Sequence, residues 1–149
     1  MAETSSRPQA RPRSPHVWLY RWPITMGMSI LHRITGFGLA LGTLILAWWL
    51  VAASMGPDAY AVFEGAAFHW FGRLVLFGFT VALVFHALNG IRHLGWDIGL
   101  GFKVPTANAT GIVVYVATLV LTVLIWVVAY DAMHGWHSIL ADNFAGDAP

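Results

Sequence analysis

The stretch that decides the fold is Phe85-His86-Ala87-Leu88-Asn89-Gly90-Ile91-Arg92-His93-Leu94-Gly95-Trp96-Asp97, which closes an otherwise apolar run over residues 74–91. On a helix, at about 100° per residue, His86, Gly90, His93 and Asp97 fall on one narrow stripe. A histidine that faces lipid is costly, so His86 is expected to face another helix or a bound group. Gly90 leaves a flat gap one turn away, which suits a flat, mostly apolar ligand with an acidic edge, such as haem. A hydrogen bond from His86 to a neighbouring helix explains these residues equally well.

Composition places the chain in a membrane. Of the 149 residues, 58% are hydrophobic and 10% are charged, whereas a soluble domain carries about 25% charged residues. The chain has no cysteine, which excludes disulfides, iron–sulfur ligation and zinc–thiolate sites on this polypeptide. The net charge of +1 predicts no nucleic-acid partner.

Long uncharged runs predict an all-α membrane protein with three transmembrane helices. We expect spans at about residues 29–53, 72–97 and 109–131, because about 20 apolar residues cross a hydrocarbon core of about 30 Å. These spans make residues 29–133 a transmembrane domain. Residues 1–28 are expected to form a basic, partly disordered arm, and residues 134–149 a tail. Gly56-Pro57-Asp58 predicts a turn that opens a first loop over residues 54–73.

The basic residues predict the orientation of the spans. Seven of the eight lysines and arginines lie in the arm, at the start of the first span, or at the end of the second span and in its loop: Arg7, Arg11, Arg13, Arg21, Arg33, Arg92 and Lys103. The positive-inside rule therefore places the N-terminus in the cytoplasm and the tail in the periplasm. The start of the first span and the end of the second span then meet at the cytoplasmic face. One membrane-embedded site is expected there, surrounded by Ser29, His32, Arg33, Arg92 and His93.

The start of the first span carries the second polar segment. Ser29, Arg33 and Gly36 share a helix face at i, i+4 and i+7, and a hydroxyl beside a guanidinium makes a donor pair for a carbonyl or carboxylate. A simpler interpretation of Arg33 is a snorkelling anchor at the helix end.

These segments resemble the larger cytochrome b membrane-anchor subunits of succinate dehydrogenases (respiratory complex II). The resemblance is carried by Arg11-Pro12, Ser14-Pro15-His16, Tyr20-Arg21, Pro23-Ile24, Ser29-x-x-His32-Arg33-x-Thr35 and His86-x-x-x-Gly90-Ile91-Arg92-His93-Leu94-x-Trp96-Asp97. Both signatures occur in order, each in its own span, and together they cover roughly residues 11–100. Arg13 departs from the aliphatic residue that usually follows Arg-Pro in this family.

The resemblance implies a b-type haem with His86 as an axial ligand through a neutral imidazole nitrogen. No second buried histidine lies at comparable depth on this chain, so the other ligand is expected from another polypeptide, the smaller cytochrome b anchor subunit. The candidates for the haem propionates are His32, Arg33, Arg92 and His93, because buried carboxylates need cations. Gly90 would pack against the haem.

Ser29 and Arg33 resemble the quinone-contacting pair of the family. Ser29 would donate a hydrogen bond to a carbonyl oxygen of ubiquinone, and Arg33 would stabilise the negative charge that develops on reduction. The chain would thereby serve the respiratory chain and the tricarboxylic acid cycle.

The resemblance also implies a hetero-oligomeric helix bundle surrounded by membrane lipid. Electrons would come from an iron–sulfur subunit, fed by a flavoprotein subunit that oxidises succinate to fumarate. The expected docking residues in the arm are Ser14, Pro15, His16, Tyr20 and Trp22. The short N-terminus favours a bacterial inner membrane over the mitochondrial one.

Two alternatives stay open from the sequence. One is a fumarate reductase anchor that works with a low-potential quinol, since sequence does not set the direction of electron flow. The other is a haem-free scaffold or small transporter subunit, in which His86 and Arg92 form a proton relay.

Overall fold

The computed structural model describes residues 21–145, and the side chains of residue 134 and residues 136–145 are outside that description. Within the described residues the regular structure is entirely helical: α1 (Ile24–Met55), α2 (Pro57–Phe68), α3 (Trp70–Asp97) and α4 (Val104–Ala145). Three of these helices, α1, α3 and α4, are long and apolar enough to cross a membrane. The predicted fold class, all-α with three spanning helices, is therefore confirmed.

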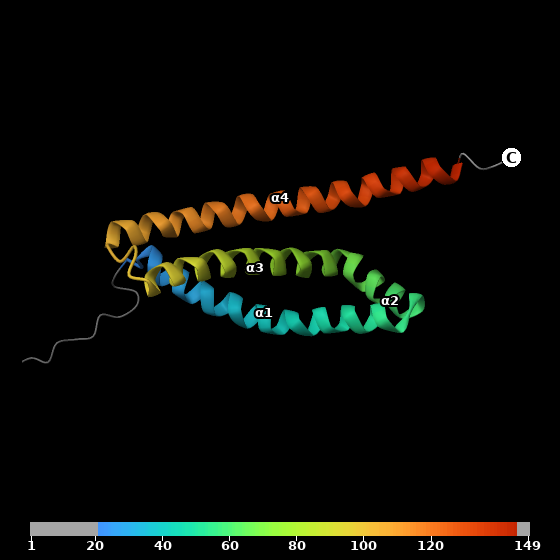
Figure 1. Cartoon of the computed structure of the whole chain (residues 1–149). Coiled ribbons are helices and arrows are strands. Elements are labelled where there is room, and N and C mark those ends of the chain that lie inside the picture. Colours follow the sequence, from blue (N-terminus) through green and yellow to red (C-terminus); the bar gives the residue numbers. More distant parts are fainter. Residues whose placement is uncertain (1–20, 146–149) are drawn as a thin grey trace, which may run out of the picture.

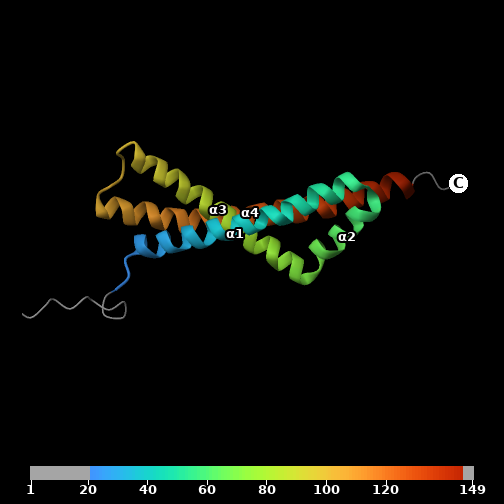
Figure 2. The same cartoon turned by 90° about the horizontal axis from the view of Figure 1, so that it is seen from below.

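The long helices alternate in direction and pack side by side. Helix α3 contacts both α1 and α4, and α1 also contacts α4 (Figure 1). Seen from below, α3 runs obliquely to the other two (Figure 2). The start of α1, the end of α3 and the start of α4 lie together at one end of the bundle, and the short helix α2 lies at the other (Figure 1).

A small core joins the three long helices near that first end. Met28 of α1, Phe85 of α3 and Val114 of α4 are all buried in one cluster. Gly111 makes this contact close, because a Cβ there would lie 2.7 Å from Met28 Sδ. Elsewhere the surface is apolar: Phe37 and Leu119 are each 69% exposed. Such a surface is stable only when lipid or partner helices cover it.

Further along α1, one glycine sets the approach of α3. A Cβ at Gly42 would overlap the ring of Phe79, and Gly42 itself is buried. The absence of a side chain therefore lets the Phe79 ring lie directly on the α1 backbone, which is the usual role of small residues between membrane helices.

The helices are longer than the predicted spans. Helix α1 begins at Ile24 rather than residue 29, and α4 continues to Ala145, beyond the predicted span end at residue 131. Pro23 caps the start of α1 in an extended conformation. Uncharged runs predict where a helix crosses the hydrocarbon core, and they do not predict where the helix itself begins or ends.

The expected loop at residues 54–73 was wrong for most of its length, because residues 57–68 form α2. The predicted turn is present: Gly56 has φ +107°, which favours glycine. Pro57 then starts α2 and Asp58 lies in its first turn, both of which favour a helix start. The ring of Phe63 meets that of Trp48 edge-on, with centroids 5.0 Å apart, and so packs α2 against α1.

Candidate functional site

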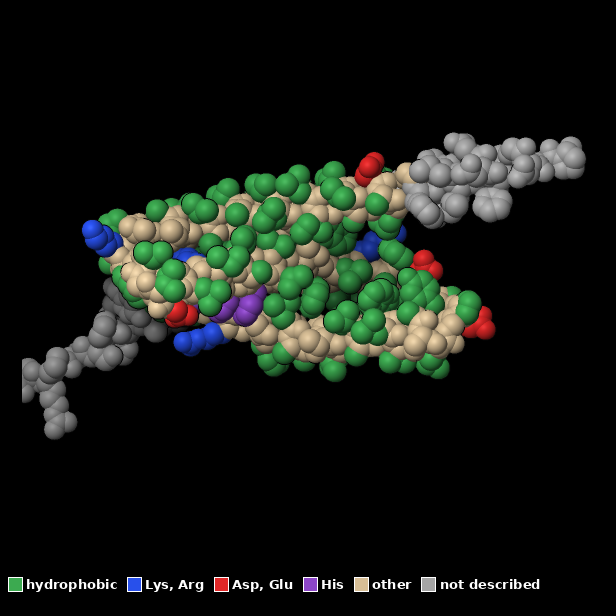
Figure 3. All heavy atoms as spheres, viewed as in Figure 1, with side chains coloured by type: hydrophobic (Ala, Val, Ile, Leu, Met, Phe, Trp, Pro, Cys, Tyr) green, Lys and Arg blue, Asp and Glu red, His purple; other side chains and the backbone are tan. Residues whose placement is uncertain are grey.

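The most concentrated polar feature of the described chain is a row of three imidazoles. His32 of α1 stacks on His86 of α3 with ring centroids 3.9 Å apart, and on His93 with centroids 5.1 Å apart. Figure 3 shows histidine side chains as one purple patch in a largely apolar face. The predicted common face of His86 and His93 is confirmed, and so is the convergence of the two polar segments.

The Nδ1 atom of His86 is held by α1. It lies 3.2 Å from the Thr35 hydroxyl oxygen and 3.2 Å from the His32 carbonyl oxygen. A carbonyl oxygen only accepts, so Nδ1 carries the proton and donates it. The other ring nitrogen, Nε2, then keeps its lone pair, and it has no hydrogen-bond partner among the described residues. A neutral imidazole with one held N–H and one free lone pair is the usual form of a metal-binding histidine.

Two glycines shape the space around the His86 ring. A Cβ at Gly36 would lie 3.0 Å from His86 Cε1, so the ring rests on the α1 backbone. By contrast, a Cβ at Gly90 would meet no atom within 4 Å. The gap predicted at Gly90 is therefore open in this chain.

The other two histidines differ in how their ring nitrogens are satisfied. His93 Nδ1 lies 2.7 Å from the Asn89 carbonyl oxygen, one turn earlier on α3. His32 Nδ1 is buried without a hydrogen-bond partner in the described chain. Orphaned buried polar atoms are rare, and this one lies in the row of imidazoles, enclosed by the chain itself.

Ser29 and Arg33 lie at the same end of α1 but face outward. Both are exposed, and neither has a hydrogen bond or ion pair with any described residue. Because His32 is adjacent to Arg33 in the helix, the pair flanks the imidazole row and does not line its interior. A site built on Ser29 and Arg33 needs a second wall from outside this chain.

Arg92 turns away from the imidazole row. Its guanidinium donates to the Ala107 carbonyl at 2.7 Å and to the Thr110 hydroxyl at 3.0 Å, both on α4, and to the Asn89 side-chain oxygen at 3.4 Å. The same guanidinium lies 4.1 Å over the ring of Trp96, a cation–π contact. Arg92 therefore joins α3 to α4. The expectation that it surrounds the site together with His32 and His93 does not match these contacts.

The spacing of residues had pointed to neither Thr35 nor Asn89 as a functional partner. Thr35 bonds backbone carbonyls one turn back, at Leu31 and His32, which is the default for a helical threonine. Asn89 is completely buried, and a polar residue inside an apolar run was the signal that could have identified it.

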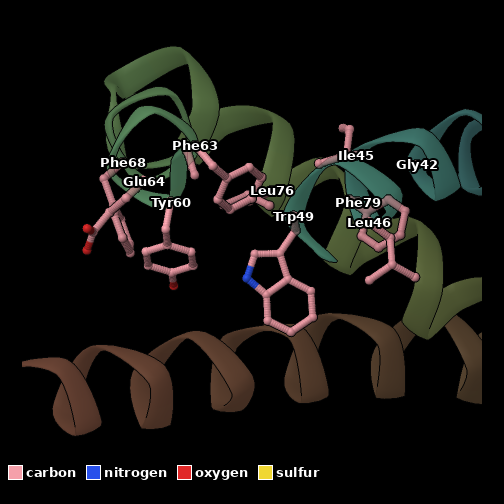
Figure 4. Close-up of a pocket in the computed structure, with 11 residues that line it drawn as sticks. Gly42, Ile45, Leu46, Trp49, Tyr60, Phe63, Glu64, Phe68, Leu76 and Phe79 are labelled. Carbon is pink, nitrogen blue, oxygen red and sulfur yellow. The ribbon is translucent and has the colours of Figure 1, made fainter. Parts of the chain in front are cut away.

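Other parts of the described chain have fewer polar or metal-binding side chains grouped together. A cavity of about 320 Å³ lies at the α2 end (Figure 4), lined by aromatic and aliphatic side chains with Glu64 as its one charged member. No group of three or more histidine, aspartate or glutamate side chains in the described part of the chain could hold a metal ion unaided. Among the predicted docking residues, Ser14, Pro15, His16 and Tyr20 lie outside the described residues, and Trp22 is 50% exposed.

The fold and the site together define an integral membrane protein with an imidazole site between two candidate spanning helices near one end of the bundle. The family model described as succinate dehydrogenase/fumarate reductase transmembrane subunit matches residues 7–125. The chain belongs to this family.

Named relatives agree with this assignment. The succinate dehydrogenase cytochrome b556 subunit of Rickettsia felis is 41% identical over 117 residues, covering 78% of this chain and 91% of that protein. The cytochrome b556 subunit of Paracoccus denitrificans is 38% identical, covering 80% and 92%. The mitochondrial cytochrome b560 subunit of Sus scrofa is 36% identical, covering 76% and 68%.

Proposed function

We propose that this chain is the cytochrome b membrane anchor of a succinate:quinone oxidoreductase, where it binds a b-type haem and forms part of the ubiquinone-reduction site. Membership of the family makes it a transmembrane subunit of an oxidoreductase complex, and the relatives named above are cytochrome b subunits of succinate dehydrogenase. The observation that carries the haem proposal is His86, with Nδ1 held by Thr35 and the His32 carbonyl and with Nε2 free.

The residues around His86 fit a haem. Gly90 leaves open space one turn from His86, which suits a flat apolar group, and the stacked imidazoles of His32 and His93 are candidate partners for its acidic edge. A b-type haem supplies one-electron transfer when bound. His93 stacks on His32, and Arg33 is exposed on the next residue of α1. His32, Arg33 and His93 are therefore better supported as propionate partners than Arg92, which is engaged with α4.

The second axial ligand is expected from another subunit. The expectation that no second histidine of this chain lies at the depth of His86 was wrong, because His32 of α1 stacks on it. The rings of His32 and His86 are parallel within 10° and in face-to-face contact, which leaves no room for a haem between them. The other described histidine, His69, caps the far end of α3. The smaller cytochrome b anchor subunit is the proposed donor of the missing ligand.

Ser29 and Arg33 are proposed as one wall of the quinone site. The hydroxyl of Ser29 donates a hydrogen bond to a carbonyl oxygen of ubiquinone, and the guanidinium of Arg33 stabilises the negative charge that grows as the ring gains electrons. Both side chains are exposed in the isolated chain, so the partner subunits form the opposite wall. Two electrons arrive through the iron–sulfur subunit, and two protons complete the reduction to ubiquinol.

The flavoprotein subunit supplies these electrons by oxidising succinate, so this chain contributes no group to that reaction. The arm is proposed to dock on the iron–sulfur subunit through Ser14, Pro15, His16, Tyr20 and Trp22. The proposed location is the bacterial inner membrane with a cytoplasmic N-terminus. The family description covers fumarate reductases as well, so an anchor that works in the direction of fumarate reduction is the second candidate function.

The test is the reduced-minus-oxidised spectrum of the complex purified with its partner subunits. His86→Leu should abolish or alter the b-type spectrum, whereas His69→Leu, at the far end of α3, should leave it unchanged. An unaltered spectrum in His86→Leu would remove this residue from the ligand role. The chain expressed without the smaller anchor subunit should bind haem poorly, and full haem binding by the chain alone would contradict a shared ligand set.

A further inference from the structure

We propose that Thr35 is a positioning residue for His86, and that Gly36 provides the space in which the ring is held. Together they would fix the tautomer and the rotation of the imidazole so that Nε2 stays free to bind a metal. This inference rests on the proposed ligation of haem by His86 and adds to it two residues of the neighbouring helix.

The Thr35 hydroxyl can act as donor and acceptor at once. It has a single proton, which it donates to the Leu31 carbonyl at 2.8 Å or the His32 carbonyl at 3.0 Å. Its lone pairs then accept the N–H of His86 across 3.2 Å. The same N–H also lies 3.2 Å from the His32 carbonyl oxygen. Helix α1 therefore provides two acceptors for the Nδ1–H of His86, and it provides no hydrogen-bond partner for Nε2.

The His86 ring is also enclosed on a face and an edge. His32 covers one face in parallel stacking with centroids 3.9 Å apart. Gly36 supports the Cε1 edge, where an added Cβ would lie 3.0 Å away. Rotation of the ring would break the Nδ1 hydrogen bonds and separate the stacked rings. The contacts from residues 32–36 therefore define one orientation.

Holding the N–H of a ligand histidine has an electronic consequence. A hydrogen bond from the non-ligating nitrogen to an acceptor makes the ligating nitrogen more basic. A more basic ligand stabilises the oxidised metal, so removal of the acceptor should make the reduction potential more positive. In Thr35→Val the His32 carbonyl remains as an acceptor, and a shift is therefore expected without loss of the haem.

The experiment is a redox titration of the purified complex, followed at the absorption band of the reduced haem, together with haem content per complex. Thr35→Val keeps the side-chain shape and removes the hydroxyl, and it should give a more positive potential than the wild type. Thr35→Ser keeps the hydroxyl and should restore the wild-type value. Equal potentials in Thr35→Val and the wild type would overturn the role of the hydroxyl.

Alanine substitutions at two glycines of α1 test whether the space at Gly36 holds the His86 ring. Gly36→Ala places a methyl group against the His86 ring and should reduce haem content or alter the spectrum. Gly38→Ala is the matched control on the same helix, because a Cβ there meets no atom within 4 Å. If Thr35→Val complexes fail to assemble, the comparison of Gly36→Ala with Gly38→Ala tests the proposal instead. Identical spectra and haem contents for the two alanine variants would then overturn the proposal.

The outcomes separate this inference from the proposed function. If His86→Leu retains a normal haem spectrum, the ligand assignment itself fails. If His86→Leu loses the haem while Thr35→Val and Gly36→Ala behave as their controls do, the haem function stands and only the positioning role is overturned.

Discussion

The imidazole rings of His32 and His86 are in parallel contact, 3.9 Å between centroids and 10° between planes, although these residues belong to different helices. This contact brings the start of α1 to the end of α3. Ser29 lies about one turn before His32, and His93 lies two turns after His86, so in these antiparallel helices both lie toward the same end of the bundle from the contact. The proposed haem and quinone residues are consequently neighbours at one end of the bundle.

The first prediction concerns the outward-facing pair. Ser29→Ala removes one hydrogen bond and should lower succinate:quinone reductase activity about fivefold to tenfold. Arg33→Leu removes a charged donor and should lower it about tenfold to a hundredfold. Succinate oxidation with an artificial electron acceptor should survive in both variants, because the flavoprotein does not depend on the quinone site.

Matched controls for this pair exist at the other end of the bundle. Ser54→Ala is suitable because the Ser54 hydroxyl bonds only the Val51 carbonyl of its own helix. Arg73→Leu removes an equal charge from an exposed position on α3. A loss of both activities in Ser29→Ala and Arg33→Leu would show that these residues serve assembly and not quinone reduction.

The second prediction concerns Arg92 as the link between α3 and α4. Arg92→Leu leaves the Ala107 carbonyl, the Thr110 hydroxyl and Asn89 without their shared donor. Thermal unfolding of the purified complex should show that the free energy of unfolding falls by about 2–4 kcal/mol. The haem spectrum should persist at low temperature, because the Arg92 guanidinium contacts none of the three stacked histidines.

Lys103→Leu is the control for Arg92, since it removes the same charge from the exposed segment just before α4. Its thermal midpoint should stay close to that of the wild type. If both variants unfold at the same temperature, the contacts of Arg92 with α4 do not stabilise the bundle. A selective loss of haem in Arg92→Leu would instead restore Arg92 as a residue of the haem site.

The third prediction concerns the close contact of α1 with α3 at Gly42. Gly42→Ala would drive a methyl group into the ring of Phe79 and should destabilise the complex by about 1–3 kcal/mol. Gly78→Ala adds the same group where no atom lies within 4 Å, and it should be neutral or slightly stabilising. Thermal unfolding of the two variants, measured in parallel, checks this, and equal stability would contradict the proposed packing.

Several features followed from the sequence alone, and each has a local physical cause. Charge-free runs of about 20 residues predict membrane helices wherever they occur. The distribution of lysine and arginine predicted that residues 29–36 and residues 86–97 meet at one end, and His32 and His86 do meet. Helical periodicity placed His86 and His93 on one face, because 3.6 residues per turn holds in any α-helix.

Other features were decided only by tertiary structure. Periodicity does not say which face of α1 meets α3, so it could not show that His32 enters between His86 and His93 or that Thr35 reaches His86 Nδ1. Nor could it show that Arg92 turns to α4, because a long side chain takes whichever partners packing brings near. The sequence by itself determined the helices, their polar segments and the end at which these meet. Packing around Met28, Gly36 and Gly42 decided how the helices are rotated about their axes, and therefore which atoms of the site touch.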